Sequence, residues 1–288
     1  MENLDTSPLD TAPEVDLGQI LGATEDSAAI DSVNKKASQI KKPYEELLYH
    51  IGDLQAFSFD RLDTGIVYFK RILERDSTSK FYPNADLDYP DNSLKIAKKS
   101  KFPGVKFGNN VLIGKNVKIG KQSIVGSNTI IEHDVIIGSN CVIGSQVMIK
   151  NSIIGDQVVI QDGCKIGLKG FGFIPLKGKN FRFPHVGKVI LKDNVELGAS
   201  CTIDRGSVGD TIIGENTFLD NQVHMAHNVK LGKNCMIAGQ VGFAGSSTLG
   251  NNVMIGGQAG ISGHLKIGNN VQIGGGSGVV NDIPDNTK

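Results

Sequence analysis

The chain has 288 residues, enough for one large domain or two ordinary ones. Its 30 basic and 30 acidic side chains balance, so the composition does not favour a nucleic-acid-binding protein. No apolar run approaches the roughly 18 residues that a membrane span requires, and no basic-then-apolar leader opens the sequence. We therefore expect a cytoplasmic protein with no transmembrane span and no nucleic-acid partner.

Acidic side chains are concentrated at the N-terminus. Residues 1–60 carry 12 acidic and 4 basic side chains, a net charge of −8, which leaves +8 for residues 61–288. This N-terminal region begins with an aperiodic stretch rich in Ser, Thr and Ala, which we expect to be disordered. Pro43, followed by an apolar pattern that stops at Gly52, predicts a short helix. A further helix and a linker are expected over 61–103.

From Val105 onward the sequence repeats every six residues, as in VKFGNN, VLIGKN and VKIGKQ. The first place of a hexad holds Val, Ser, Thr, Cys or Ala, the third holds an aliphatic residue or Phe, and the fourth is usually Gly. Alternate residues of a strand point to the same side, so places one and three are expected to face inward. Gly at place four and Asn at place six suit a tight bend, where a positive φ is often needed.

Twenty-seven such units follow one another, two of them short. A six-residue repeat of short strands is typical of a solenoid, and it resembles the left-handed parallel β-helix of the hexapeptide acyltransferases. In that family three hexads form one triangular coil, which gives about nine coils here, stacked at roughly 4.8 Å each. We therefore expect an all-β solenoid over 104–282 and a short tail at 283–288.

All four cysteines occupy the first, inward place of a hexad: Cys141, Cys164, Cys201 and Cys235. Their spacing fits neither a metal site nor a disulfide framework. We expect four buried free thiols, which agrees with a reducing cytosol.

Two stretches depart from the repeat. Residues 170–188, GFGFIPLKGKNFRFPHVGK, form an excursion rich in Phe, Gly and Lys, and such insertions in solenoids often serve binding. In the second stretch the fourth-place glycine is replaced five times, by Asp204, Asp220, Ala226, Ala238 and Ala244. Because regular hexads are structural, we expect the chemistry where they change.

Within the second stretch, His227 stands at the fifth place of VHMAHN, a turn position. Counting 18 residues per coil leads from His227 to Gly245 and then to Gly263, beside His264. These residues are predicted to line one edge of the prism, at roughly 5 Å per coil. An imidazole base and an amide that faces the reacting carbonyl are the minimum equipment for acyl transfer.

Asp220 and the remaining histidines are less clearly tied to a function. Asp220 either orients an imidazole or closes its own turn. His224, at an outward second place, is either an interface residue or a surface one. His133 is expected to be a solvated turn residue, and His50 and His185, which have no partner motif, to be structural or on a loop surface.

Four motifs make a more specific resemblance: CTIDRG at 201–206, DNQVHMAHNV at 220–229, GFGF at 170–173 followed by RFPHVG, and GQAGISGH at 257–264. They resemble the UDP-3-O-acylglucosamine N-acyltransferase family of lipid A biosynthesis, and the likeness covers about residues 100–282. Residues 1–60 do not resemble that family's N-terminal uridine-binding domain, and the sequence ends at IPDNTK without the family's helical extension.

The resemblance implies transfer of a (3-hydroxy)acyl chain from acyl carrier protein to the 2-amino group of a UDP-3-O-acyl-glucosamine. It assigns the general base to His227, the oxyanion-holding amide to Gly245, and contact with the carrier's phosphopantetheine phosphate to His264. It also implies a homotrimer with sites in the grooves between prisms. No bound cofactor or metal is expected, since the carrier delivers the phosphopantetheine.

Three further residues, Asp220, Phe171 and Phe173, are expected to contact the substrate or the carrier. An O-acyltransferase or a CoA-dependent acetyltransferase acting on a sugar is an alternative with a similar histidine, although TIDRG and the GFGF excursion favour the N-acyltransferase. A zinc-binding β-helix hydratase is a second alternative. It needs three histidines converging at one edge, whereas His227 and His264 are predicted to lie two coils apart.

Overall fold

The computed structural model describes residues 94–176 and 178–288. The predicted acidic region at 1–60, its short helix and most of the helix and linker expected over 61–103 lie outside these residues. The described end of that linker forms strand β1 (Lys95–Ile96) and a single 3-10 turn (Lys99–Lys101). Strand β1 pairs antiparallel with β3.

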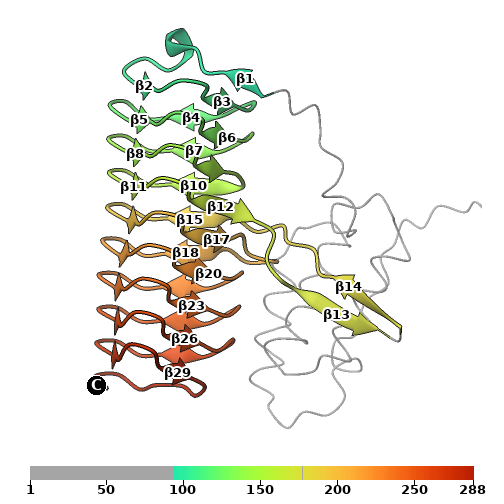
Figure 1. The fold of residues 1–288 in the computed structure, drawn as a ribbon, viewed down its shortest axis with the longest axis vertical. Helices are drawn as coiled ribbons and strands as arrows, with labels where there is room; N and C mark the ends of the chain where they lie inside the picture. Colours follow the sequence, from blue (N-terminus) through green and yellow to red (C-terminus); the bar gives the residue numbers. More distant parts are fainter. Residues whose placement is uncertain (1–93, 177) are drawn as a thin grey trace, which may run out of the picture. The chain divides into compact units, whose positions relative to one another are not determined.

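The rest of the described chain winds into a triangular prism of stacked coils (Figure 1). Each coil contributes one short strand to each of three sheets, and apart from β1 all the strands of these sheets pair in parallel. The all-β solenoid of about nine coils that the hexads predict is confirmed.

The ten-stranded sheet contains β1, β3 (Leu112–Ile113), β6 (Ile130–Ile131), β9 (Met148–Ile149), β12 (Lys165–Leu168), β17 (Thr202–Asp204), β20 (His224–Met225), β23 (Gly242–Phe243), β26 (Gly260–Ile261) and β29 (Gly278–Val279). The nine-stranded sheet contains β2 (Lys106–Phe107), β5 (Ile124–Val125), β8 (Val142–Ile143), β11 (Val159–Ile160), β16 (Glu196–Leu197), β19 (Phe218–Leu219), β22 (Met236–Ile237), β25 (Met254–Ile255) and β28 (Gln272–Ile273). The eight-stranded sheet contains β4 (Lys118–Ile119), β7 (Ile136–Ile137), β10 (Ser152–Ile154), β15 (Val189–Leu191), β18 (Thr211–Ile213), β21 (Lys230–Leu231), β24 (Thr248–Leu249) and β27 (Lys266–Ile267). Strands β13 (Phe173–Leu176) and β14 (Lys179–Arg182) form a separate antiparallel hairpin.

Two insertions leave the prism at the same edge. Partners in the regular coils are 18 residues apart, as in β20 and β23. Partners in β12 and β17 are 37 residues apart, because the 170–188 excursion with its β13–β14 hairpin is inserted after β12. Partners in β17 and β20 are 22 residues apart, because the extra turn at 207–210 is inserted after β17. Both insertions therefore lie where the ten-stranded sheet meets the eight-stranded one.

The core fills the inside of the prism with first- and third-place side chains, as predicted. Val125, Ile131 and Val135, for example, are fully buried. The four cysteines are also fully buried free thiols, which confirms the prediction made from their hexad position. Hydrophobic burial along the prism axis thus holds the coils together.

The two bend residues of the hexad have different roles, which corrects one expectation. Positive φ angles occur at the sixth place, as at Asn116 (59°) and Asn234 (56°), where Asn tolerates the left-handed region. Fourth-place glycines are required instead by close approach of the next coil. A Cβ on Gly126, for example, would lie 2.5 Å from Gly144 C.

Residues 283–288, expected as a tail, add to the last coil. Ile283 N–H donates to Lys266 O at 3.0 Å, and Asn286 N–H donates to Asn269 O at 2.8 Å. Across 94–176 and 178–288, no helix is both long and apolar enough to cross a membrane.

We expect Gly250→Ala to destabilise the β-helix by about 1–3 kcal/mol. The added Cβ would lie 2.7 Å from Asn269 Oδ1 and 2.8 Å from Asn269 N. Gly278→Ala is the matched control, because no described atom lies within 4 Å of its added Cβ. The midpoint of urea unfolding, followed by circular dichroism, should fall for the first variant only, and equal midpoints would contradict the steric role of place four.

Candidate active site

His227, Gly245 and His264 lie on one edge of the prism, as the 18-residue count predicts. Ser246 N–H donates to His227 O at 2.9 Å, and His264 N–H donates to Gly245 O at 3.0 Å. His227, Gly245 and His264 follow strands β20, β23 and β26 of the ten-stranded sheet. They therefore occupy the edge that also carries both insertions.

Asn228 determines the tautomer of His227. Asn228 Oδ1 accepts the Ser207 backbone N–H at 2.9 Å and the Ser207 hydroxyl at 2.7 Å, so this atom is the amide oxygen. His227 Nδ1 lies 3.0 Å from the same oxygen and therefore donates a proton to it. Nε2 is left unprotonated, which makes it the basic atom of the ring.

Beside this base, the edge carries a backbone amide without an internal acceptor. On another edge the fifth-place N–H donates to a side chain of the next coil, as Lys233 N does to Asn251 Oδ1 at 2.8 Å. The corresponding residue after Gly245 is Gly263, and within the described residues the Gly245 N–H makes no hydrogen bond. A Cβ on Gly245 would lie 2.8 Å from His227 Nε2, so the base and the amide border the same space.

Burial is the main influence on the His227 imidazole. It lowers the pKa of His227 below the ordinary value of 6.5, since a charged ring loses hydration there. The hydrogen bond to Asn228 raises the pKa, and the proximity of His264 lowers it further. His227 is therefore neutral, and able to accept a proton, at neutral pH.

The TIDRG motif anchors the excursion to this edge. Arg205 Nε donates to Gly187 O at 2.7 Å, and Arg182 Nη1 of the hairpin donates to Gly170 O at 2.9 Å. Asp204 is buried here, and burial raises its pKa to about 7 although Arg182 acts in the opposite direction. Two of the motifs that carry the family resemblance are thus parts of one structural unit.

Two residues of this site, Asn228 and Ser207, were not named from the sequence, and a third, His185, was expected only to be structural or on a loop surface. Asn228 could have been identified from the sequence, because it directly follows the predicted base in the AHNV motif. Ser207 and His185 belong to the insertions, where the 18-residue count fails. His185 is fully buried, and its ring centroid lies 5.1 Å from that of His227.

Asp220 and His224 do not join His227 within the chain. Asp220 Oδ1 accepts the Asn221 N–H at 2.7 Å, and it follows β19 of the nine-stranded sheet, so it closes its own turn at a different edge. His224 Nδ1 lies 2.8 Å from Thr202 Oγ1 on the outer face of the ten-stranded sheet. Neither residue orients the His227 imidazole of the same chain, and Asn228 does so instead.

Phe171 and Phe173 give the excursion an exposed aromatic surface. Their side chains are 82% and 39% exposed, and their ring centroids are 4.9 Å apart. Arg182 Cζ lies 4.7 Å from the centroid of the Phe173 ring. Contact of these two rings with a substrate or a carrier stays a prediction.

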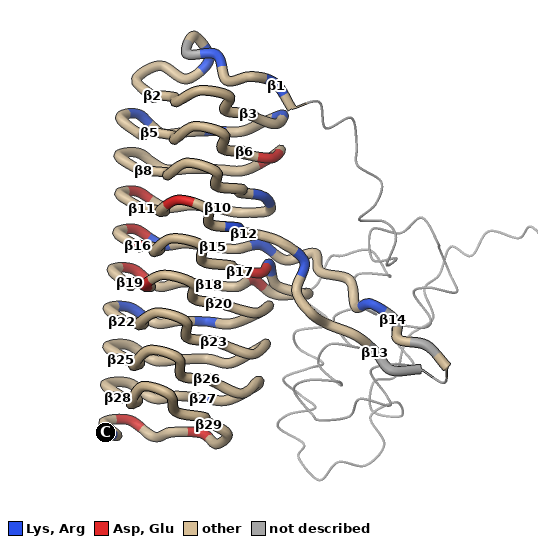
Figure 2. The backbone as a smooth tube through the Cα atoms, viewed as in Figure 1, with Lys and Arg blue, Asp and Glu red and all other residues tan. Residues whose placement is uncertain are grey.

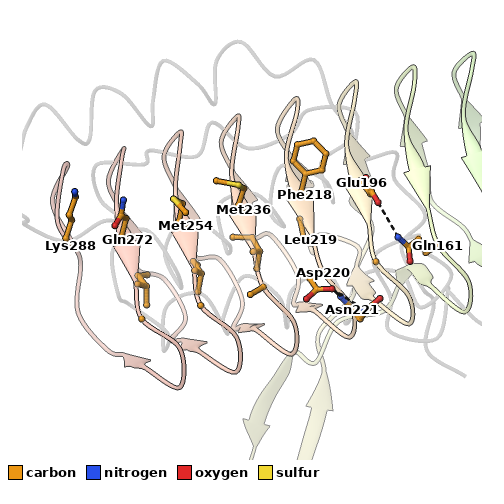
Figure 3. Close-up of a pocket in the computed structure, with 17 residues that line it drawn as sticks. Gln161, Glu196, Phe218, Leu219, Asp220, Asn221, Met236, Met254, Gln272 and Lys288 are labelled. Atoms are coloured by element: carbon orange, nitrogen blue, oxygen red, sulfur yellow. Dashed lines mark hydrogen bonds between the residues drawn. The ribbon is translucent and has the colours of Figure 1, made fainter.

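A separate groove of about 840 Å³ runs along the nine-stranded sheet (Figure 3). Phe218, Met236 and Met254 form an apolar stripe in it, and they are 41%, 49% and 42% exposed. The groove does not include His227, which follows a strand of the ten-stranded sheet.

Residues 234–265 contain no Asp, Glu, Lys or Arg, and the corresponding coils are tan in Figure 2. This segment includes Gly245 and His264. Lys230 and Lys233 precede it, and Lys266 follows it. The segment therefore offers no carboxylate, ammonium or guanidinium group, and the lysines lie only at its borders.

The repeat matches the family model described as bacterial transferase hexapeptide (six repeats) over residues 116–151 and 210–245. Together with the three-sheet prism, this match defines a hexapeptide-repeat protein with the left-handed parallel β-helix that the sequence predicts.

Individual proteins show more specific similarities. The chain is 46% identical over 83 residues to a UDP-3-O-acylglucosamine N-acyltransferase of Azorhizobium caulinodans and 52% identical over 85 residues to UDP-3-O-acylglucosamine N-acyltransferase 2 of Nitrobacter winogradskyi. These matches cover 29% and 30% of this chain, and they span only about a quarter of each relative (23% and 25%). A solved UDP-N-acetylglucosamine acyltransferase from Campylobacter jejuni is similar with a TM-score of 0.55 and 26% identity, over 62% of this chain and 68% of that one.

The pKa of His227 should be measurably below 6.5, and Asn228→Ala should lower it further. The reason is that the Asn228 oxygen accepts from Nδ1–H and so favours the protonated ring. Titration of ¹⁵N-histidine-labelled protein by NMR measures both values, with His227→Gln identifying the signal. The same pKa in wild type and Asn228→Ala would contradict the orienting role of Asn228.

Proposed function

We propose that this chain is an N-acyltransferase of lipid A biosynthesis that uses an acyl-carrier thioester as donor and the 2-amino group of a UDP-3-O-acyl-glucosamine as acceptor. The observation that carries the proposal is the pairing, at His227 and Gly245, of an oriented imidazole base with a backbone amide that has no acceptor among the described residues. The names of the relatives and the TIDRG and GFGF motifs support the amino acceptor.

The proposed reaction begins when the amine attacks the thioester carbonyl carbon. A C–N bond forms, and His227 Nε2 takes the proton that the amine loses. The Gly245 N–H donates to the oxyanion of the tetrahedral intermediate. The C–S bond then breaks, the carbonyl re-forms, and the His227 imidazolium returns its proton to the departing thiolate, so that the products are an amide and the free phosphopantetheine thiol.

In this proposal the donor's phosphopantetheine lies along the edge toward His264. His264 is exposed and lies one coil beyond Gly245. Its backbone N–H donates a hydrogen bond to Gly245 O. Its imidazole and the nearby Lys266 would contact the phosphate, while Phe171 and Phe173 would contact the substrate or the carrier. Asp220, on a different edge of the same chain, would contact ligand only in a groove between two copies.

A second candidate keeps the donor and replaces the amine with a sugar hydroxyl. The similarity to a solved UDP-N-acetylglucosamine acyltransferase supports it. The same base and amide serve an oxygen nucleophile equally well. The geometry of His227 and Gly245 therefore does not distinguish N-acyl transfer from O-acyl transfer. Assays of acyl-carrier and CoA thioesters against amino and hydroxyl sugars separate these reactions directly.

The proposed assembly is a cytoplasmic homotrimer with sites between prisms. The exposed apolar stripe of Phe218, Met236 and Met254 supports it, because a row of large apolar side chains on a flat sheet is suited to burial by a second copy. The four free buried thiols agree with a reducing compartment.

His227→Ala should lower the rate of acyl transfer by about 10²–10⁴-fold while leaving the fold intact, because general-base catalysis of this kind contributes that much. The measurement is turnover of acyl-carrier thioester with a UDP-3-O-acyl-glucosamine, beside circular dichroism of the same samples. His133→Ala is the matched control, since His133 occupies the same hexad place on the same edge, four coils away after β6. Near-normal turnover of His227→Ala would show the proposed base to be wrong.

Met236→Lys should break the trimer, because the added charge would have to be buried without a partner. Size-exclusion chromatography with light scattering should then give a mass near that of one 30.7 kDa chain instead of three. Thr248→Lys adds the same charge to an exposed outward position on the eight-stranded sheet and should leave the mass unchanged. A trimer that survives Met236→Lys would place the interface elsewhere.

A further inference from the structure

His185 is buried beside the proposed base without a role in the reaction described above. It lies on the returning arm of the excursion, just after β14, and it has no solvent exposure. Its Nδ1 is 2.9 Å from Phe183 O, and because a carbonyl only accepts, Nδ1 carries the proton. Among the described residues, His185 Nε2 is the one buried side-chain nitrogen or oxygen that has no hydrogen-bond partner.

The His185 ring packs directly against His227. The two ring centroids are 5.1 Å apart with planes at 71°, an edge-to-face arrangement. Gly170 lies against both rings: a Cβ there would be 2.8 Å from His185 Nε2, 2.8 Å from His227 Cβ and 2.9 Å from His227 Cδ2. The unprotonated Nε2 is therefore on the side of His185 that is turned toward Gly170 and His227.

This orientation matters once His227 has accepted a proton. A neutral imidazole with its proton on Nδ1 has the negative end of its dipole at Nε2, so that end is directed toward the developing imidazolium. Burial, with the proximity of His227, lowers the pKa of His185 to about 3, so His185 itself stays neutral while His227 titrates. Three other basic side chains act electrostatically on the pair: Arg182 on the hairpin and Arg205 on the prism act on His185, and His264 on the same edge acts on His227.

We propose that His185 is a positioning residue for the base: its neutral ring holds the His227 imidazole edge to face, and its unprotonated Nε2 stabilises the cation that forms on proton transfer. The proposal rests on the proposed function insofar as it concerns catalysis. Its structural part, a coupling between the two imidazoles, holds for the protein whatever reaction it catalyses.

Two substitutions at His185 separate packing from the acceptor atom. His185→Asn retains a donor at the position of Nδ1 for Phe183 O but removes the part of the ring that contacts His227. His185→Gln places an amide near the position of Nε2 and can return an acceptor. His133→Asn is the matched control at a half-buried turn four coils away.

We expect His185→Asn to lower the pKa of His227 in an NMR titration of ¹⁵N-histidine-labelled protein, and His185→Gln to restore most of the difference. In the acyl-transfer assay His185→Asn should lower kcat about tenfold with little change in KM, because His185 touches the base and not the substrate. Because the pKa of His227 falls in His185→Asn, the acid limb of the plot of kcat against pH should also move to lower pH. His133→Asn should change neither.

An unchanged His227 pKa in a folded His185→Asn variant would overturn the proposal. If that variant does not fold, the wild-type spectra decide: they should show His185 as the Nδ1–H tautomer from pH 5 to pH 8 with cross-relaxation to the His227 ring, and a protonated Nε2 would overturn the proposal. Failure of the proposed function can be told apart from failure of this proposal. If the wild-type protein is inactive in the acyl-transfer assay, the NMR titration still reports whether His185 changes the pKa of His227.

Discussion

The spacing between successive coils constrains the whole molecule. A residue of a regular strand lies beside the residue 18 positions later, and backbone hydrogen bonds such as His264 N to Gly245 O join successive coils. Fourth-place glycines are needed because the next coil approaches too closely for a Cβ. The same spacing sets each fifth-place amide against the fifth-place residue of the next coil, as Lys233 N is set against Asn251.

The candidate site depends on what the next coil offers to the Gly245 amide. Asn251 accepts the Lys233 N–H on one edge, but on the edge of Gly245 the next coil supplies only Gly263. The Gly245 N–H therefore has no acceptor among the described residues, and it lies beside a base. Both insertions lie on this edge, and they add what the repeat cannot: Ser207 orients Asn228, and the arm carrying His185 covers the imidazole.

The parts that sequence analysis predicted are those that obey the repeat. The inward faces, the buried cysteines and the alignment of His227 with Gly245 all follow from counting in sixes and eighteens. The same count could have placed Asp220 on a different edge from His227, but its role was left open between orienting an imidazole and closing its own turn. The role of the fourth-place glycine was only partly predicted, because the pattern shows that Gly is needed there but not whether φ or close approach requires it.

The contacts of Ser207 and His185 were not predictable from the repeat. The Ser207 contact to Asn228 spans 21 residues, and His185 reaches His227 by way of a hairpin whose fold-back leaves no periodic trace. Such contacts depend on three-dimensional packing of an irregular segment.

The most direct test of the central claim is a crystal structure of the protein with a stable ketone analogue of an acyl-phosphopantetheine thioester. The ketone oxygen is expected at about 2.7–3.1 Å from Gly245 N and the ketone carbon beside His227 Nε2. An analogue whose carbonyl lies away from this edge, with the Gly245 N–H and His227 Nε2 both unliganded, would contradict it.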